Sequence, residues 1–160
     1  MKKSDRMEGE IPVYGSGGIT GYHNTALINK ASIIIGRKGT VGSLYWEDNP
    51  FYPIDTVFYI EPKEMPLTFC YYLLQTLSLE HMNTDAAVPG LNRNNVYRLE
   101  VLNPPKKLIR SFDKIISEFR RKMHTNNKEI QTLQKTRDTL LPKLLSGEPD
   151  VSKITAIKEN

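Results

Sequence analysis

The chain has 160 residues, a formal net charge of +4 and one cysteine. Such a length suits one ordinary domain with an appended segment, and two full domains would be crowded. A single cysteine excludes a disulfide framework and a zinc site built on cysteines. No run approaches the roughly 20 apolar residues of a membrane span, and residues 1–12 lack the apolar core of a signal peptide, so we expect a soluble, cytoplasmic chain.

The first distinctive segment is residues 11–24, IPVYGSGGITGYHN, which is rich in glycine. A dinucleotide-binding loop needs Gly-x-Gly-x-x-Gly at the start of a helix, but here the third glycine comes one position late, at Gly21, and no helix start follows. A P-loop is also excluded, because Gly-Lys-Ser and Gly-Lys-Thr do not occur in the sequence. The alternative is two turns in which glycine supplies positive φ angles.

Three short β-rich runs come next, at residues 31–35, 42–46 and 56–60. Their β-branched and aromatic side chains are typical of strands. Residues 67–79 follow a proline and predict a helix with that proline in its first turn. Strand runs followed by helices indicate an α+β domain.

Two stretches mimic catalytic motifs. Metal-dependent nucleases have a motif in which two carboxylates share one cation. Four residues occur in the same order here, Pro53, Asp55, Glu61 and Lys63. A straight strand between the two acids would hold them about 20 Å apart, too far to share a metal ion. Residues 103–106, NPPK, resemble the motif of adenine methyltransferases but lack the aromatic that stacks on the target base. We therefore expect no catalytic residue, no metal and no cofactor.

A long basic helix is predicted over residues 106–141, where it would measure about 54 Å. Residues 104–146 carry 11 Lys and Arg against 4 Asp and Glu, whereas residues 1–103 carry 9 against 11. An acidic partner and a solvated helix face both account for this charge. A proline pair begins the helix, and Pro142 is expected to kink or interrupt it.

Apolar residues repeat along this helix at coiled-coil spacing, with one stutter. The predicted seam consists of Leu108, Phe112, Ile115, Phe119, Met123, Asn126, Ile130, Leu133, Arg137 and Leu140. A domain of about 100 residues cannot cover so long a stripe, so we expect the helix to pair with another helix, most simply in a homodimer. The alternative is an amphipathic helix folded back on its own domain.

Five blocks, in order, resemble one half of a specificity subunit of type I restriction-modification systems. They are IPVYGSGGITGYHN, SIIIGRKGTVGSLYW, FYPIDTVFYIEP, VPGLNRNNVYRLEVLNPP and TRDTLLPKLLSGE. The resemblance implies an α+β fold, with a β-rich target recognition domain at residues 1–103, a long C-terminal coiled-coil helix at 104–146 and a tail at 147–160. Residues 1–10 do not match the usual opening strand, so we expect the domain to lack its usual N-terminal start.

This resemblance also implies a function. Such a half is non-catalytic, binds one part of a split target in double-stranded DNA, and directs methyltransferase subunits and, indirectly, a restriction subunit to it. Two halves pair their helices antiparallel. The alternative is a non-catalytic assembly or scaffold module whose helix binds partners without reading DNA, which the acidic balance of residues 1–103 favours.

The resemblance makes the polar residues of the glycine-rich and asparagine-rich loops candidates for DNA contact. They are Tyr22, His23, Asn24, Arg37, Lys38, Asn92, Arg93, Asn94 and Asn95. Asparagine amides suit adenine, and arginine suits guanine or phosphate. These residue types fit several target sequences, and they leave open whether the partner half is a second copy or a different chain.

Overall fold

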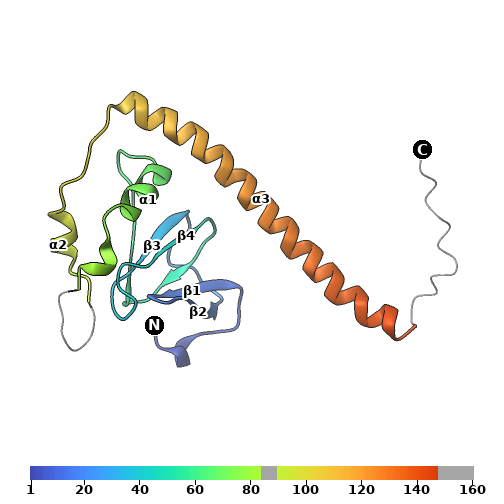
Figure 1. Cartoon of the computed structure of the whole chain (residues 1–160). Coiled ribbons are helices and arrows are strands. Elements are labelled where there is room, and N and C mark those ends of the chain that lie inside the picture. Colours follow the sequence, from blue (N-terminus) through green and yellow to red (C-terminus); the bar gives the residue numbers. More distant parts are fainter. Residues whose placement is uncertain (84–89, 148–160) are drawn as a thin grey trace, which may run out of the picture. The chain divides into compact units, whose positions relative to one another are not determined.

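The computed structural model describes residues 1–83 and 90–147 (Figure 1). Its N-terminal half contains two three-stranded sheets. The first has the order β2-β1-β5, with β1 antiparallel to β2 and parallel to β5. Its strands are β1 (Ile11–Gly15), β2 (Gly18–His23) and β5 (Tyr52–Pro53). The short helix η1 (Lys3–Asp5) precedes them.

The second sheet places β3 (Ser32–Gly36) between β4 (Leu44–Glu47) and β6 (Val57–Tyr59), antiparallel to both. All three strands were predicted, and their observed bounds differ by only one or two residues. Every residue of β3 is buried. Ile34 belongs to one core cluster, whereas Ile33 and Ile35 belong to a second. Because successive side chains of a strand point to opposite faces, β3 separates two cores.

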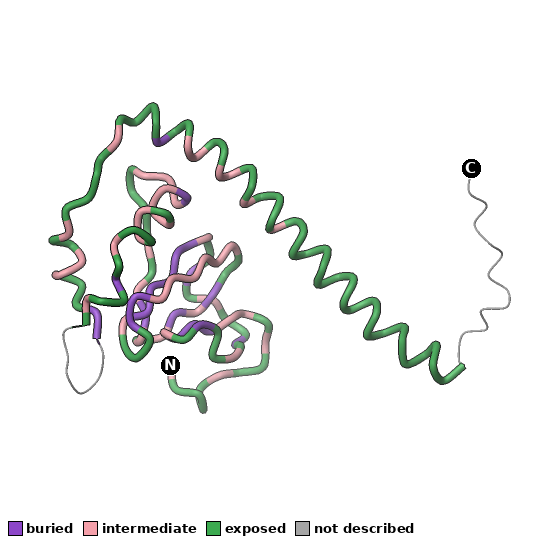
Figure 2. The backbone as a smooth tube through the Cα atoms, in the orientation of Figure 1, coloured by how far each residue is buried: buried purple, intermediate pink, exposed green. Residues whose placement is uncertain are grey.

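The two cores differ in what surrounds them. The first contains Tyr14, Ile28, Ile34, Phe51 and Val57. The second contains Ile33, Ile35, Val41, Leu79 and Leu91, with α1 side chains packed against it. Figure 2 shows the buried segments concentrated in this strand region. The fold is therefore the predicted α+β arrangement, a β-rich domain followed by a long helix.

Four helices follow the strands in the described residues. They are α1 (Leu67–Gln75), η2 (Leu79–His81), α2 (Arg93–Tyr97) and α3 (Lys106–Leu145). The predicted helix at 67–79 ends early, at Gln75, because Ser78 adopts a left-handed conformation with φ of 48°. None of the described helices is long and apolar enough to cross a membrane.

The first turns of α3 pack on α1. The Phe112 ring lies edge-on to Phe69 and Tyr72, with centroids 6.0 and 5.6 Å away. The Thr68 hydroxyl donates a 2.6 Å hydrogen bond to Asp113 Oδ1, and Ile109 is buried. The compact N-terminal unit accordingly extends to Ser117, whereas the sequence suggested a division at residues 103 and 104.

The rest of α3 belongs to a second unit, residues 118–160, and each described residue after His124 is exposed. Of the apolar residues in the predicted seam, Phe112 packs against α1 of its own domain, and the others are exposed. Pro142 was expected to kink or interrupt the helix; it does not interrupt it, since α3 continues to Leu145. Pro142 lies in the last turn of α3, and three residues of the helix follow it. The tail beyond Gly147 lies outside the described residues.

The glycine-rich segment forms the β1–β2 hairpin, whose strands were not predicted. Gly18 and Gly21 have φ of 101° and 139°, which confirms the expected positive φ angles at two of its four glycines. The tip of the hairpin contacts the loop that follows β3. The Ser43 hydroxyl of that loop and the Tyr45 hydroxyl of β4 donate to the Ser16 carbonyl oxygen over 2.6 and 3.2 Å.

Gly42 in the loop after β3 provides a test of this close packing. It has φ of 75°, and a Cβ there would clash with the backbone of Leu79 and Glu80. We expect Gly42→Ala to lower the free energy of unfolding by more than about 2 kcal/mol. Gly17→Ala is the matched control, because its Cβ would lie 3.9 Å from the Thr40 hydroxyl. Urea unfolding measures both, and equal stabilities would contradict the described packing.

Candidate functional site

Two loops that are far apart in the sequence meet beside β6. The Leu91 N–H donates to the Arg37 carbonyl oxygen over 2.7 Å, and Lys38 forms an isolated β-bridge with Gly90. The N–H groups of Arg37 and Lys38 both donate to the Thr56 carbonyl oxygen, over 2.8 and 3.2 Å. These backbone bonds place the loop after β3 next to the start of α2.

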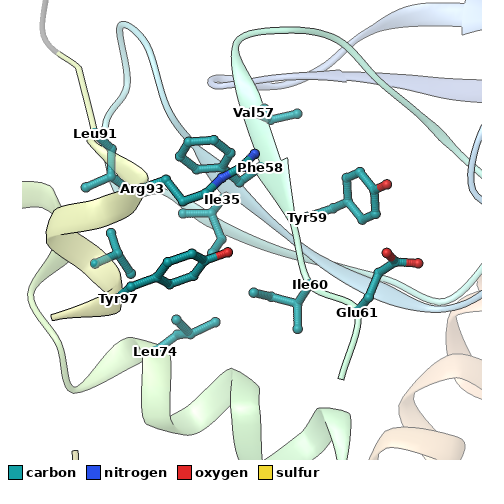
Figure 3. Close-up of a pocket in the computed structure, with 11 residues that line it drawn as sticks. Ile35, Val57, Phe58, Tyr59, Ile60, Glu61, Leu74, Leu91, Arg93 and Tyr97 are labelled. Atoms are coloured by element: carbon teal, nitrogen blue, oxygen red, sulfur yellow. The ribbon is translucent and has the colours of Figure 1, made fainter. Parts of the chain in front are cut away.

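The joined loops bring two guanidinium groups to one aromatic ring. The Cζ atom of Arg37 lies 5.2 Å from the centroid of Phe58, and that of Arg93 lies 4.9 Å from it. Arg37 Nη1 also donates to the Asp55 carbonyl oxygen over 3.4 Å. Figure 3 shows Arg93 beside Phe58, reaching from α2 toward β6. The two distances from the guanidinium carbons to the ring centroid are within the range of a cation–π contact.

These side chains line a cavity of about 360 Å³, here called the arginine cavity. Its lining is Arg37, Phe58, Leu91, Asn92, Arg93 and Asn94. Within residues 1–83 and 90–147, neither arginine forms an ion pair with a carboxylate. A larger cavity of about 500 Å³ shares Phe58 and Arg93 and is mostly apolar; its carboxylate, Glu61, pairs with Lys30 at 2.9 Å (Figure 3). The arginine cavity is thus a positively charged concavity.

Four of the nine predicted contact residues line this cavity, and Lys38 is exposed beside Arg37. Asn92 also has a structural role, because its Oδ1 accepts the Asn94 N–H over 2.8 Å and caps α2. Asn95 is half-buried and outside the lining. The structure therefore brings together most of the residues of two separately predicted loops.

The remaining three predicted residues lie at the opposite end of β2 from the hairpin tip, about 20 Å along the strand. Tyr22 and Asn24 are exposed there. His23 is only 6% exposed; its Nδ1 accepts the Met7 N–H over 3.0 Å, and its ring lies edge-on to Tyr52. The assignment of His23 to a DNA-contacting surface is therefore corrected, since its side chain is enclosed by its own domain.

Phe58 was missed as a site residue. The sequence identified it only as part of a strand, although the alternation of Val57 and Phe58 puts their side chains on opposite faces of β6. Val57 enters the first core, and Phe58 packs at the edge of the second. Strand alternation could have placed Phe58, but nothing in the sequence shows which cations would reach it.

Two titratable groups outside the cavity have shifted pKa values. Burial, together with the hydrogen bond to Glu47, raises the pKa of the Tyr14 phenol, and burial raises the pKa of the Cys70 thiol. Both shifts favour the neutral form, which is opposite to the activation of a nucleophile. Among the described residues, no three acidic, histidine or cysteine side chains are grouped to hold a metal ion.

Comparison with known proteins identifies the family. The model of the type I restriction modification DNA specificity domain matches residues 1–135. The chain belongs to this family. The specificity subunit of the HindI type I restriction enzyme from Haemophilus influenzae is 29% identical over 133 residues, and that of the MjaIX enzyme from Methanocaldococcus jannaschii is 31% identical over 88 residues.

A solved structure has the same fold as this specificity domain. The crystal structure of a type I restriction-modification S subunit from M. genitalium matches 91% of the chain, with a TM-score of 0.72 and 21% identity. The alignments cover 79% and 54% of this chain but only 29% and 20% of the two curated relatives, and 41% of the solved chain. The specificity domain thus spans less than half of each of these proteins.

The enclosed position of His23 predicts a structural role. His23→Ala removes the acceptor of the Met7 N–H and the ring contact with Tyr52, so the free energy of unfolding should fall by roughly 1–3 kcal/mol. Tyr22→Ala is the adjacent control, because this side chain is 55% exposed, and it should change stability by less than about 0.5 kcal/mol. Urea unfolding followed by circular dichroism measures both variants. A larger loss in the Tyr22 variant would contradict the described burial.

Proposed function

We infer that the specificity domain is a sequence-specific DNA-recognition module that performs no chemistry itself. In this proposal it directs modification subunits, and indirectly a restriction subunit, to a split DNA target. The arginine cavity is the observation that carries the proposal, because it joins two arginines and two asparagines from separate loops. A scaffold module would use the helix but would need no such cavity.

The chemistry of the cavity suits a DNA groove. Arginine can donate two parallel hydrogen bonds to guanine O6 and N7, and asparagine can pair with adenine N6 and N7. Lys38 is exposed next to these residues and suits a phosphate, since a flexible ammonium group binds as a point charge. The cavity residues would read bases while Lys38 contributes a contact that is independent of sequence.

The charge distribution indicates that binding depends on assembly. Residues 1–103 carry two more acidic than basic residues, so the recognition domain alone has little general attraction for DNA. The excess of positive charge lies in residues 104–146, most of which form α3. We therefore expect weak affinity for the chain alone and stronger affinity when modification subunits are bound.

The two kinds of contact can be separated by substitution. Lys38→Ala should weaken binding to all duplexes about equally and reduce the salt slope by roughly one counterion. Arg93→Ala should cost on the order of 1–3 kcal/mol at one base position and relax specificity there. Lys63→Ala removes a positive charge outside the cavity and serves as the control. Fluorescence anisotropy on a library of duplexes, with the modification subunit present, measures these effects; unchanged binding in every variant would refute DNA recognition by these loops.

The exposed stripe of α3 supports pairing with a second helix. Phe119, Met123, Ile130 and Leu133 are 50–63% exposed in the single chain. Soluble proteins seldom leave such a continuous apolar stripe in water. An antiparallel homodimer would cover it and would place two recognition domains on inverted half-sites, since two-fold symmetry in the protein is mirrored in the DNA.

Polar residues interrupt the same stripe and would set its register. Asn126 and Arg137 fall at predicted seam positions and are exposed in the single chain. A polar residue at a coiled-coil core position lowers stability but selects one alignment of the helices, because other alignments leave it without a partner. In this way the seam would set the distance between the two half-sites.

Substitution in the seam tests the pairing. Each apolar seam residue that is buried on pairing should contribute about 2 kcal/mol, so Ile130→Gln with Leu133→Gln should dissociate the dimer. The control is Lys128→Gln with Lys135→Gln, which changes exposed residues of the same helix outside the seam. Sedimentation velocity at tens of micromolar reports the mass. A monomeric unsubstituted chain that retains its helical signal would contradict the homodimer and indicate a different partner helix.

A further inference from the structure

The two arginines of the cavity share one ring, and this geometry needs an explanation. With Cζ atoms 5.2 and 4.9 Å from the same centroid, the two guanidinium carbons are at most about 10 Å apart. Like charges this close repel each other, and in the described residues no carboxylate forms an ion pair with either. The negative face of an aromatic ring offsets part of this repulsion.

Phe58 is itself held firmly. It lies in β6, where it is the register partner of Ile35 in the buried strand β3. Its neighbour Val57 is anchored in the first core, so β6 cannot rotate without exposing Val57. The ring is therefore a fixed platform, and two long, flexible side chains from different loops lie against it.

We propose that Phe58 is a positioning residue that holds Arg37 and Arg93 as one paired reader of guanine. This inference rests on the proposed function and specifies the ligand of the same cavity. The ring restricts both side chains before DNA arrives, so less conformational entropy is lost on binding. The ligand is the O6 and N7 edge of guanine, which a guanidinium group contacts with two parallel hydrogen bonds.

Guanine accounts for the arrangement better than phosphate does. A phosphate contact needs charge but little orientation, and the exposed Lys38 already offers such a contact. A bidentate base contact needs the guanidinium plane to be fixed. The ring contact restricts that plane in both arginines, and the Asp55 carbonyl oxygen, which accepts from Nη1, restricts it further in Arg37.

The test compares two substitutions of the ring in the full chain assembled with a modification subunit. Phe58→Leu keeps an apolar side chain but removes the aromatic face, whereas Phe58→Tyr keeps the face. The preferred duplexes are selected from a random library, and binding is then measured with guanine replaced at each preferred position. Phe58→Leu should reduce guanine preference about tenfold or more at one or two positions, with an unchanged salt slope, and Phe58→Tyr should retain the preference.

A second pair of variants keeps the test independent of the folding of Phe58→Leu. Arg37→Lys and Arg93→Lys retain the charge and leave the ring in place, but lysine lacks the rigid planar fork that makes two parallel hydrogen bonds. Each should lose guanine preference about tenfold while binding to non-target duplexes stays unchanged. Thermal unfolding of every variant identifies any that is misfolded. If Phe58→Leu is misfolded, the lysine variants still test whether the two arginines read guanine.

Three results would overturn the inference. The first is a guanine preference that survives in both lysine variants. The second is a Phe58→Leu variant that binds all duplexes more weakly by the same factor and keeps its base preference. The third is a set of selected duplexes without guanine at the positions that these variants affect. In each case the proposed function stands, because the unsubstituted assembly still selects a sequence. An unsubstituted assembly that selects no sequence would instead refute the proposed function and this inference together.

Discussion

The burial of β3 between two cores is the constraint on which the candidate site depends. Ile34 enters one core while Ile33 and Ile35 enter the other, so the strand cannot shift by one residue without exchanging its faces. This fixed strand holds β6 through its backbone pairing, and Phe58 with it. The loop that leaves the end of β3 carries Arg37 and Lys38. Apolar burial thus sets the position of a polar site.

Two glycines, Gly36 and Gly42, allow the backbone around the loop after β3 to pack closely. Side chains at Gly36 or Gly42 would collide with the backbone of Thr40 or of Leu79 and Glu80. Their absence lets the loop after β3 turn tightly and lie against η2 and the β1–β2 hairpin. Gly36 and Gly42 are therefore explained by the folding of the loop that presents Arg37.

The long helix α3 packs on its own domain at its start and carries exposed apolar side chains along its length. Its first turns dock on α1 through Phe112, Asp113 and the buried Ile109, which joins the start of the helix to the recognition domain. Other apolar residues, from Leu108 onward, are exposed and are available to a partner helix.

The sequence by itself determined the three strands of the second sheet and the long helix, because strand alternation, helical periodicity and turn residues depend on neighbours along the chain. It also indicated the family, through five blocks of residues that resemble one half of a specificity subunit. Only the tertiary structure decided that Arg37 meets Arg93 on Phe58, that His23 is enclosed and that Phe112 packs on α1. These outcomes depend on which surfaces the two cores bring together. The β1–β2 hairpin was also missed, because glycine in a strand gives no local signal that separates it from a loop.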